Sequence, residues 1–274
     1  MKYGELFLRF PGFKTRAVTF SFDDGSIDDR QMVEILNRYG IKCTFNINSG
    51  SIEGNAAKVQ FEEFEELYKC HEIASHTYTH PHLDNLDLGG ITYQIIKDRE
   101  TLEEKTGKII EGFAYPFGLR ETDGMIDCIK NSGIRYGRTT AATHKFELPT
   151  DYFRWNPTCH QADPKLPELA ESFFKPDDME HLWRIKLQLF YIWGHSYEFK
   201  DNWERLESIC ETVGGCENVW YATNSEIIDY ISAFKTLRCS VKNNIVYNPT
   251  DTDVFVRVCD KDVLLKKGEV TVIE

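Results

Sequence analysis

Along the chain, short runs of apolar residues alternate with segments in which apolar residues recur every three or four positions. The first run, residues 17–22, combines apolar, β-branched and aromatic side chains, which predicts a buried strand. The segment after it has helical spacing, begins at a predicted capping box of Ser26 and Asp29, and ends at Gly40. These residues therefore predict a strand followed by a helix.

The same strand–helix unit recurs along most of the chain. Further strands are predicted at 41–47, 72–75, 112–115, 134–140, 187–194 and 218–222. Further helices are predicted at 59–69, 90–106, 122–132, 201–213 and 224–235. Alternation of strands and helices predicts a parallel sheet covered by helices, and seven such units favour an α/β barrel related to the (β/α)8 form.

The pattern changes near residue 237. Residues 237–274 lack a helical period and contain short β-rich runs separated by turn signals. Because so short a segment seldom folds alone, we expect a small antiparallel appendage packed on the barrel. The predicted organisation is a barrel domain of residues 1–236 and a β-rich C-terminal extension of residues 237–274, which has either a structural role or a role in binding carbohydrate or a partner.

Charge and composition narrow the possible partners. The 274 residues include 32 Lys and Arg against 44 Asp and Glu, and the net charge of −12 argues against a nucleic-acid or anionic-membrane surface. No run approaches the length of a membrane span. Glu5 and Arg9 interrupt the apolar residues of the N-terminus, and eight cysteines form no Cys-x-x-Cys pair. These features predict a cytoplasmic protein without a signal peptide, unless a longer precursor is exported.

Polar side chains follow nearly every predicted strand. In chain order they are Asp23 and Asp24, Asn46 and Asn48, His76 and His80, Tyr115, Arg138, His195, and Asn224. In parallel β/α folds, functional groups lie beyond the carboxyl ends of the strands. We therefore expect acid, imidazole and amide groups to converge on one rim of the barrel.

The spacing of His76 and His80 indicates a metal site. Two histidines four positions apart point the same way on one helical turn and can chelate one divalent ion, with a carboxylate from after the first strand as third ligand. Such a ligand set leaves positions open for water and substrate, as catalytic sites do. Because the side chains of Asp23 and Asp24 diverge, one can bind the metal while the other accepts a proton from water. Taken singly, each motif also fits an ordinary turn or a pair of surface histidines.

Four motifs carry a family resemblance. They are Thr19-Phe-Ser-Phe-Asp-Asp-Gly25, Ser75-His-Thr-Tyr-Thr-His80, Tyr115-Pro-Phe-Gly118 and Trp193-Gly-His195. In this order they resemble the polysaccharide deacetylase family, which is carbohydrate esterase family 4 or the NodB-homology domain. The resemblance covers residues 15–235 and implies a distorted (β/α)7-type barrel.

The resemblance also implies a reaction, the hydrolysis of an acetamido or acetyl ester group on a sugar. It implies that Asp23 is the general base, that His195 protonates the leaving amine, and that the backbone N–H of Phe117 helps to hold the oxyanion. The implied metal ligands are Asp24, His76 and His80. The implied cofactor is one divalent ion that polarises the carbonyl and supplies the attacking water; zinc suits these ligands, and cobalt, nickel or iron fit the same set.

Two positions depart from the family pattern. Ala114 stands where the family usually has an arginine that tethers the catalytic base, and loss of that charge is expected to raise the pKa of the base. Arg138 and Arg154 are the candidates to replace it. The family's fourth motif, which orients the late histidine, has no clear match, and residues 153–157 stand in its place. Metal binding is thus better supported than efficient deacetylation.

Other residues are assigned to the substrate side of the site. The predicted substrate-binding residues are Tyr115, Trp155, Trp193, Arg138 and Arg154. A sugar-facing strip is predicted from Trp193, His195, Tyr197 and Glu198, because aromatic faces stack on pyranose rings, although core packing accounts for Trp193 equally well. Three further histidines are expected at the surface, namely His144, His160 and His181.

Two rival functions compete with deacetylation. The pair His80 and His82 is similar to the His-x-His of barrel amidohydrolases, although those enzymes place it after the first strand. A sugar-binding protein with weak or no turnover is motivated by Ala114 and opposed by the presence of both Asp23 and His195. The expected partner is an acetylated oligo- or polysaccharide, and no coiled-coil or interface pattern indicates an oligomer.

Overall fold

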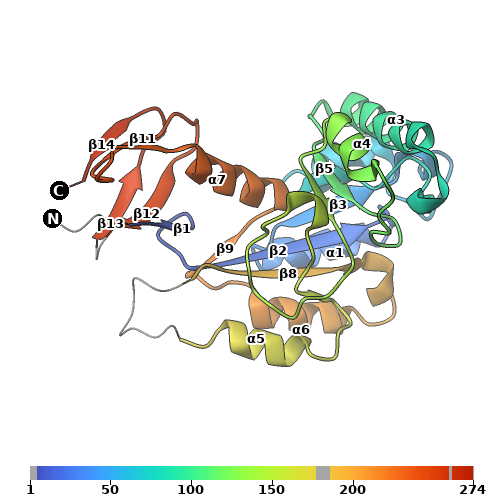
Figure 1. The fold of residues 1–274 in the computed structure, drawn as a ribbon. Helices are drawn as coiled ribbons and strands as arrows, with labels where there is room; N and C mark the ends of the chain where they lie inside the picture. The colour runs from blue at the N-terminus through green and yellow to red at the C-terminus, as the bar shows by residue number, and fades with distance from the viewer. Residues whose placement is uncertain (1–4, 177–185, 259–260, 274) are drawn as a thin grey trace.

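The computed structural model describes residues 5–176, 186–258 and 261–273. Its centre is a parallel sheet in which seven strands follow one another side by side (Figure 1). In sheet order they are β6 (Tyr136–Arg138), β5 (Gly112–Ala114), β4 (Glu72–Ser75), β3 (Cys43–Ile47), β2 (Arg16–Asp23), β8 (Gln188–His195) and β7 (Cys159–His160). An eighth strand, β9 (Val219–Tyr221), pairs with the first residues of β2.

The segment around residues 155–160 joins the two edges of this sheet. Trp155 N–H donates to the Gly137 carbonyl, and Thr139 N–H donates to the Trp155 carbonyl, so this segment runs beside β6. Slightly further on, Thr158 N–H donates to the Tyr191 carbonyl and β7 pairs with β8. The parallel strands therefore form a distorted seven-stranded barrel, as the sequence predicted.

One strand of that barrel was not predicted. The seventh predicted strand, 218–222, is β9, which pairs with β2 beside the ring. The ring instead uses β7, which lies in a stretch of about forty residues without a predicted element, as does helix α5 (Leu166–Phe173). A strand of two residues is too short to show an alternating pattern.

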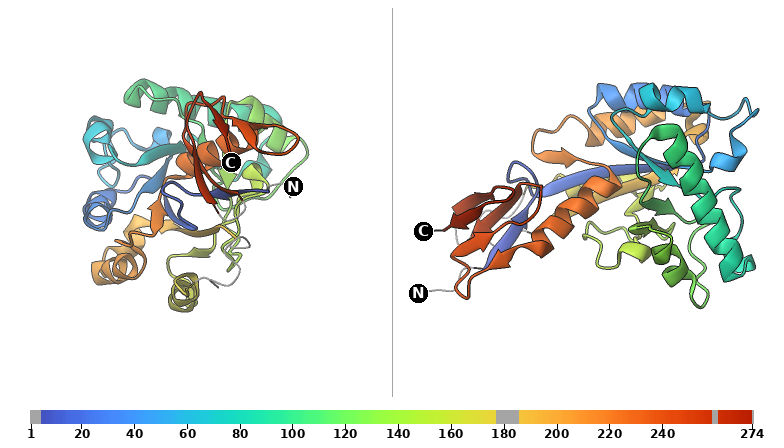
Figure 2. Two further views of the ribbon diagram at one scale, coloured as in Figure 1. Left: turned by 90° about the vertical axis from the view of Figure 1, so that its left-hand side faces the viewer. Right: turned by 90° about the horizontal axis from the view of Figure 1, so that it is seen from above.

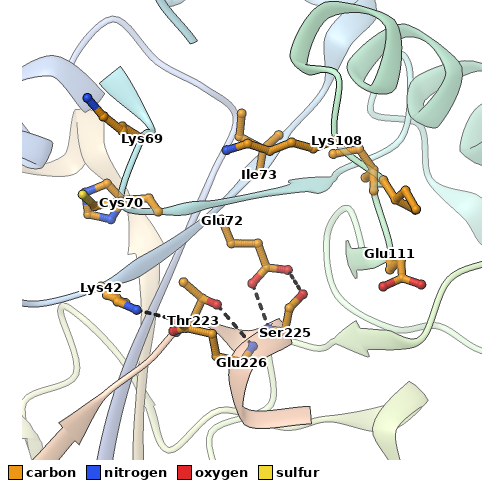
Figure 3. A pocket seen from close by; sticks show the side chains of 13 residues that line it. Lys42, Lys69, Cys70, Glu72, Ile73, Lys108, Glu111, Thr223, Ser225 and Glu226 are labelled. Carbon is orange, nitrogen blue, oxygen red and sulfur yellow. Dashed lines mark hydrogen bonds and ion pairs between the residues drawn. The ribbon is translucent and has the colours of Figure 1, made fainter. Parts of the chain in front are cut away.

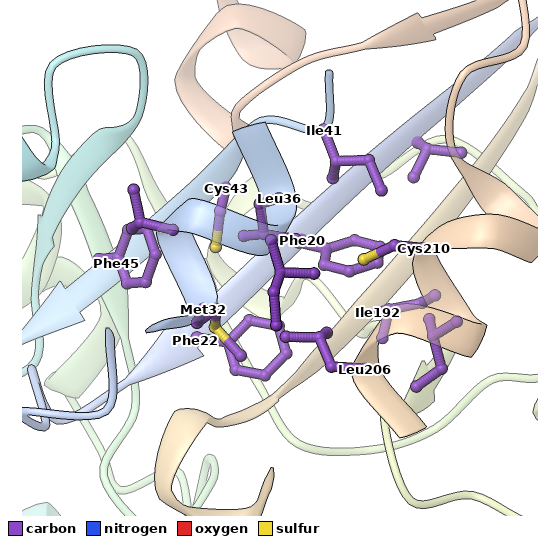
Figure 4. Packing of buried hydrophobic residues seen from close by; sticks show 14 of the residues in the cluster. Phe20, Phe22, Met32, Leu36, Ile41, Cys43, Phe45, Ile192, Leu206 and Cys210 are labelled. Carbon is purple, nitrogen blue, oxygen red and sulfur yellow. The ribbon is translucent and has the colours of Figure 1, made fainter. Parts of the chain in front are cut away.

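Helices cover the outer face of the barrel (Figures 1 and 2). They are α1 (Asp29–Arg38), α2 (Phe64–Leu67), α3 (Leu88–Thr106), α4 (Met125–Asn131), α5 and α6 (Trp203–Val213). Short 3₁₀ turns occur at η1 (Ser49–Ser51), η2 (Phe61–Glu63), η3 (Leu83–Asn85), η4 (Tyr152–Arg154) and η6 (Ser196–Phe199). The core beneath α1 and α6 is apolar, with Phe20, Phe22, Met32, Leu36, Ile192 and Leu206 in contact (Figure 4).

The start of α1 differs from its prediction. Ser26 and Asp29 form no capping box, because the Ser26 hydroxyl donates to Asp28 and the Asp29 carboxylate is fully buried. Asp29 instead accepts hydrogen bonds from the Tyr68 hydroxyl, at 2.8 Å, and from the Ser196 hydroxyl. This carboxylate therefore ties α1 to the end of α2 and to the turn that follows β8.

The C-terminal appendage consists of two small antiparallel sheets at the end of α7 (Asn224–Thr236), as Figure 2 shows. One sheet is β10 (Arg238–Cys239), β11 (Ile245–Tyr247) and β14 (Val270–Val272); the other is β12 (Val254–Val258), β13 (Lys261–Leu265) and β1 (Leu6–Arg9). The predicted boundary at residue 236 thus needs one correction, because β1 pairs with β12 and belongs to the appendage. Sequence pattern cannot reveal this pairing, because it joins opposite ends of the chain.

Two further expectations concern the whole chain. The seven cysteines in the described part of the chain are free thiols, and Cys259 lies outside it. Within the described ranges, no helix is long and apolar enough to cross a bilayer.

Candidate active site

All three predicted metal ligands lie together beyond the carboxyl ends of β2 and β4. The Nε2 atoms of His76 and His80 are 3.1 Å apart, and Asp24 Oδ1 lies 3.9 Å and 3.7 Å from them, respectively. Ligand atoms that share one zinc-sized ion at about 2.0–2.2 Å lie roughly 3–4 Å apart. Asp24, His76 and His80 therefore form a group that can hold one metal ion.

The state of His76 favours this role. Its Nδ1–H donates to the Ala114 carbonyl at 2.8 Å, which leaves the Nε2 lone pair directed toward His80 and Asp24. Burial lowers the pKa of His76 to about 4, so the ring is neutral near pH 7 and can act as a ligand. Burial also lowers the pKa of His80. Ala114, where the family usually has an arginine, thus contributes its backbone carbonyl to the site.

The two histidines converge through a loop, and the predicted helical turn is wrong. Thr77 and His80 both adopt left-handed backbone conformations, with φ of 65° and 56°, and His80 N–H donates to the Thr77 hydroxyl. The loop is held by Asp98 of α3, which is fully buried and accepts hydrogen bonds from Ser75 Oγ and from His76 N–H. No sequence pattern identified Asp98, because it lies on a helix whose other buried residues are apolar.

Amide side chains hold both aspartates. Asn48 Nδ2 donates to Asp24 Oδ1 at 2.9 Å, and Asn46 Nδ2 donates to Asp23 Oδ1 at 2.8 Å. Lys58 Nζ donates to the backbone carbonyl of Asp24 at 2.6 Å, where φ is 82°. Each carboxylate has its own asparagine, and the two carboxylates lie at 3.8 Å and 3.9 Å from the same atom, His76 Nε2.

Asp23 is buried beside Arg138, which replaces the arginine missing at position 114. The Arg138 guanidinium donates to both carboxylate oxygens of Asp23 and comes from β6, which β5, β4 and β3 separate from β2 in the sheet. Burial by itself raises the pKa of Asp23, but the nearby charges of Arg138, His76 and His195 outweigh burial, so the pKa lies below its ordinary value. The expected rise in the pKa of the base therefore does not occur.

His195 ends β8 on the side of Asp23 away from His80. Its Nε2 lies 4.0 Å from Asp23 Oδ2, and its Nδ1 lies 3.5 Å from Glu198 Oε2. Burial lowers the pKa of His195, but the negative charges of Glu198, Asp23 and Asp24 outweigh burial and raise it above the ordinary value. A histidine with a raised pKa can carry a proton near neutral pH and release it to a leaving group.

Phe117 adopts a strained backbone conformation at the same rim. Its φ is 59°, within a turn in which Gly118 N–H donates to the Tyr115 carbonyl. Among the described residues no acceptor is found for the Phe117 N–H, which stays available to an oxyanion. The Phe117 ring is 53% exposed, stacks on His82 at 3.8 Å and touches the edge of His80.

Most of the predicted substrate-binding side chains are buried or point away from the site. Tyr115 is buried and its hydroxyl donates to the Phe153 carbonyl, and Trp155 packs in the core between Tyr136 and Tyr191. These assignments need correction, because a ring enclosed by core residues cannot meet a sugar. Sequence alone did not distinguish them, because a tryptophan after a strand can turn either inward or outward.

Arg154 and Trp193 also differ from their predicted roles. Arg154 points to the surface, where it pairs with Glu121 and Asp151, so it reaches neither Asp23 nor the rim. The Arg138 guanidinium lies over the Trp193 ring, with its Cζ 4.6 Å from the ring centre, so Trp193 packs against the Asp23–Arg138 ion pair. Arg138 itself is fully buried and therefore holds Asp23 and does not contact substrate.

Of the three histidines expected at the surface, two are described. His144 is half-buried and pairs with Asp163 at 2.7 Å, whereas His160 lies in the site, with its Nε2 3.2 Å from Glu198 Oε2. His181 lies outside the described residues. The exposed aromatic rings at the rim are Phe117 and Tyr197, which stacks on His195 at 4.9 Å.

A hollow lies at the opposite, amino-terminal ends of the strands (Figure 3). Glu72 at the start of β4 lies on its wall and accepts hydrogen bonds from Ser225, Tyr136 and Thr44. This carboxylate joins β3, β4, β6 and the first turn of α7, and its bonds are all used within the fold. Glu72 on the wall of this hollow therefore holds the amino-terminal ends of the strands together, whereas the predicted catalytic residues lie at the opposite end of the barrel.

Comparisons with known proteins agree with this geometry. Residues 12–137 match the family model for polysaccharide deacetylase. The peptidoglycan-N-acetylglucosamine deacetylase PgdA of Listeria monocytogenes is 28% identical over 111 residues, which are 39% of this chain and 23% of that protein. A chitin deacetylase of Pestalotiopsis is 33% identical over 93 residues, which are 32% of this chain and 30% of that protein.

A solved structure supports the fold. The Xyl-CE4 domain of a multidomain xylanase from the hindgut metagenome of Trinervitermes trinervoides matches with a TM-score of 0.55 and 16% identity, over 80% of this chain and 92% of that domain. The chain spans 23% to 30% of the length of the two curated relatives. The family match ends before Arg138 and His195, so the roles of these two residues depend on the geometry described above.

Proposed function

We propose that the chain, whose residues 12–137 match the polysaccharide deacetylase family model, is a carbohydrate esterase family 4 enzyme that removes acetyl groups from an oligo- or polysaccharide by metal-dependent hydrolysis. The observation that supports this proposal most strongly is the arrangement of Asp23 between two groups. A metal-ligand group lies on one side of it, with His76 Nε2 at 3.8 Å, and His195 lies on the other, at 4.0 Å.

The chemistry follows from these positions. Asp24, His76 and His80 would hold a divalent ion, which would supply Lewis acidity toward an acetyl carbonyl and toward the attacking water. The Asp23 carboxylate, kept ionised by Arg138, accepts the proton of the attacking water. The Phe117 N–H donates to the oxyanion, and His195 Nε2 gives a proton to the departing amine nitrogen.

Zinc is the ion we propose for this site. Two neutral imidazole nitrogens and one carboxylate oxygen match its ligand preference, and three protein ligands leave open positions of the kind catalytic zinc uses. Cobalt, nickel and iron accept the same ligands, so the identity of the ion is a matter for metal analysis.

An N-acetylated sugar is the substrate class we propose. The raised pKa of His195 matters most for an amide, because an amine leaves only after protonation, whereas an alcohol or phenol leaves more easily. The relatives named for peptidoglycan and chitin deacetylation support an N-acetylglucosamine unit. The exposed rings of Phe117 and Tyr197 offer faces on which a pyranose can stack.

The test is acetate release from N-acetylglucosamine oligomers and acetylated xylan, with zinc and with a chelator. We expect zinc-dependent release from the N-acetyl substrates by the wild type. Asp23→Asn is expected to keep one equivalent of zinc and to lose activity by about 10²–10⁴, the usual contribution of a general base. His80→Ala is expected to lose the metal and the activity together.

Two results would contradict the proposal. Asp23→Asn turning over at the wild-type rate would remove the base from its assigned role. Zinc bound at one equivalent without acetate release from any acetylated sugar would favour another amide substrate, or sugar binding without turnover, and isothermal titration with the same oligomers would distinguish these two.

A further inference from the structure

A second carboxylate, Glu198, lies behind His195 and has no role in the mechanism above. Several nitrogen donors converge on one of its oxygens, Oε2. Gln161 Nε2 donates to it at 2.8 Å and the His195 backbone N–H donates to it at 3.1 Å. The imidazole nitrogens His160 Nε2 and His195 Nδ1 lie 3.2 Å and 3.5 Å away.

This arrangement fixes Glu198 before any substrate arrives. Gln161 is buried at 3% exposure, and His160 belongs to β7, so one side of the carboxylate is held by the barrel wall. The other side is held by the chain reversal at η6, because the His195 N–H bond links residues three apart. Burial by itself raises the pKa of Glu198, but hydrogen bonds from His160, His195 and Gln161 lower it strongly, so the carboxylate is ionised.

We propose that Glu198 is a positioning residue that holds the His195 imidazole with its Nε2 edge toward Asp23 and keeps that ring ready to deliver a proton. The geometry carries the proposal. His195 Nδ1 lies 3.5 Å from Glu198 Oε2, within ion-pair distance but without a hydrogen bond, and Nε2 lies 4.0 Å from Asp23 Oδ2, so the two nitrogens face different carboxylates. This inference rests on the proposed function, because it concerns the acid of the same reaction.

The same three side chains, His160, His195 and Glu198, also have the composition of a metal site. The hydrogen bonding of His160 favours the positioning role instead. Ala162 N–H donates to His160 Nδ1 at 3.1 Å, so the neutral ring carries its proton on Nε2, the atom that faces Glu198. A nitrogen that carries a proton is a hydrogen-bond donor and not a metal ligand.

The groups that face His195 set the direction of the expected change. They are Asp23 and Asp24 after β2, His160 on β7, and Tyr197 and Glu198 on η6. Glu198→Gln removes one negative charge and retains an oxygen for the backbone N–H of His195. The imidazolium is then less stabilised, so the basic limb of the rate profile is expected to move to lower pH.

The test compares an amide with an activated ester in the zinc-loaded full chain. For Glu198→Gln we expect kcat on N-acetylglucosamine oligomers to fall about 10- to 100-fold, a part of the usual general-acid contribution of about 10²–10⁴, with little change in KM. On 4-nitrophenyl acetate, whose leaving group needs no proton, kcat is expected to change by less than about threefold. Glu204→Gln, at an exposed glutamate of α6, is the matched control.

A double-mutant cycle shows whether Glu198 acts through His195. In a His195→Ala background, Glu198→Gln is expected to cause no further loss on the amide. An equal loss in both backgrounds, or equal slowing of amide and ester, would overturn the positioning role. Glu198→Asp, which keeps the charge on a shorter side chain, is expected to restore part of the amide activity.

An NMR titration separates this inference from the proposed function. The imidazole signals of His195, assigned by comparison with His195→Ala, are expected to titrate at lower pH in Glu198→Gln than in the wild type. An unchanged titration would overturn the inference even in an active enzyme. Absence of acetate release by the wild type would instead contradict the proposed function, and the titration would still report on the contact between Glu198 and His195.

Discussion

At the scale of single residues, the buried pair of Asp23 and Arg138 is the most consequential contact of the site. Both side chains are almost fully enclosed, and the guanidinium also lies over the Trp193 ring. A buried ion pair adds little net stability compared with a well-packed apolar core, but removing one partner leaves the other charge buried and uncompensated. Arg138 therefore stabilises the fold around Asp23 and helps to keep the Asp23 carboxylate ionised.

Arg138→Met is expected to lower the free energy of unfolding by about 3–5 kcal/mol, because it leaves Asp23 as an unpaired buried carboxylate. Burial then raises the pKa of Asp23 without opposition from Arg138, so the acidic limb of kcat/KM is expected to move to higher pH. Urea unfolding and a pH–rate profile measure the two effects.

The matched control for this prediction is Arg154→Met. Arg154 is exposed and pairs with Glu121 and Asp151 at the surface, where an ion pair contributes only about 0–1 kcal/mol. If the two variants lost the same stability, burial of the Asp23–Arg138 pair would not be the reason for the loss.

At the scale of elements, Asp29 joins three segments that surround the site. It is the first residue of α1, and its carboxylate binds the hydroxyls of Tyr68, after α2, and of Ser196, next to His195. Burial raises its pKa to about 7 despite these hydrogen bonds. The contact is therefore made by a carboxylate that holds a proton more tightly in the folded chain than in the unfolded chain.

This difference predicts a pH-dependent stability with a defined sign. In the unfolded chain Asp29 has a pKa of about 3.9, so between pH 4 and pH 7 the folded state binds more protons and stability falls as pH rises. Asp29 is expected to cost the wild type about 2–3 kcal/mol between pH 5 and pH 8. Asp29→Asn has no carboxylate to titrate at this position, so its free energy of unfolding relative to the wild type is expected to rise from pH 5 to pH 8.

Urea unfolding at the two pH values measures this effect. Comparing the variant with the wild type isolates Asp29 from other buried acids such as Asp98, whose pKa burial raises to about 6. Parallel stability profiles for the two proteins would show that Asp29 titrates as it does in the unfolded chain.

At the scale of the whole molecule, strand pairing and the packing of α7 connect the barrel to the appendage. The first described strand, β1, pairs with β12 of the appendage, and α7 places Ala233 and Phe234 against the apolar residues of the two small sheets. The Tyr230 hydroxyl donates to the Arg9 carbonyl at 2.6 Å and accepts from Phe255 N–H at 2.9 Å. Tyr230 therefore links α7 to both β1 and β12.

Tyr230→Phe is expected to lower the free energy of unfolding by about 1–3 kcal/mol, because it leaves two buried backbone groups without their partner. Acetate release is expected to persist, since Tyr230 contacts none of the groups at the carboxyl ends of the strands. Tyr152→Phe serves as the control, because that hydroxyl accepts a hydrogen bond only from the exposed Lys235, and a change within about 0.5 kcal/mol is expected. Thermal unfolding of the three proteins compares these values, and equal losses would argue against a role for Tyr230 in joining the two parts.

The sequence by itself determined most helices and strands, and it indicated that polar side chains collect at the carboxyl ends of the strands. Apolar periodicity located most strands and helices within a few residues, because a strand or helix must bury one face wherever it lies in the fold. Asp23, Asp24, His76 and His195 were found because a polar group directly after a buried strand stands out against the pattern. These signals are local, so a single sequence carries them.

Only the tertiary structure decided which residues meet. Arg138 reaches Asp23 from another strand, Glu198 is held by His160 of β7 and by the next residue, Gln161, and β1 pairs with β12 at the far end of the chain. Trp155 turns into the core although the same ring could have faced a sugar. The sequence could mark Arg138, Trp155 and Glu198 as candidates, but it could not say which partner each one meets. Barrel closure, which brings distant segments together, is a property of the packed strands and not of any one segment.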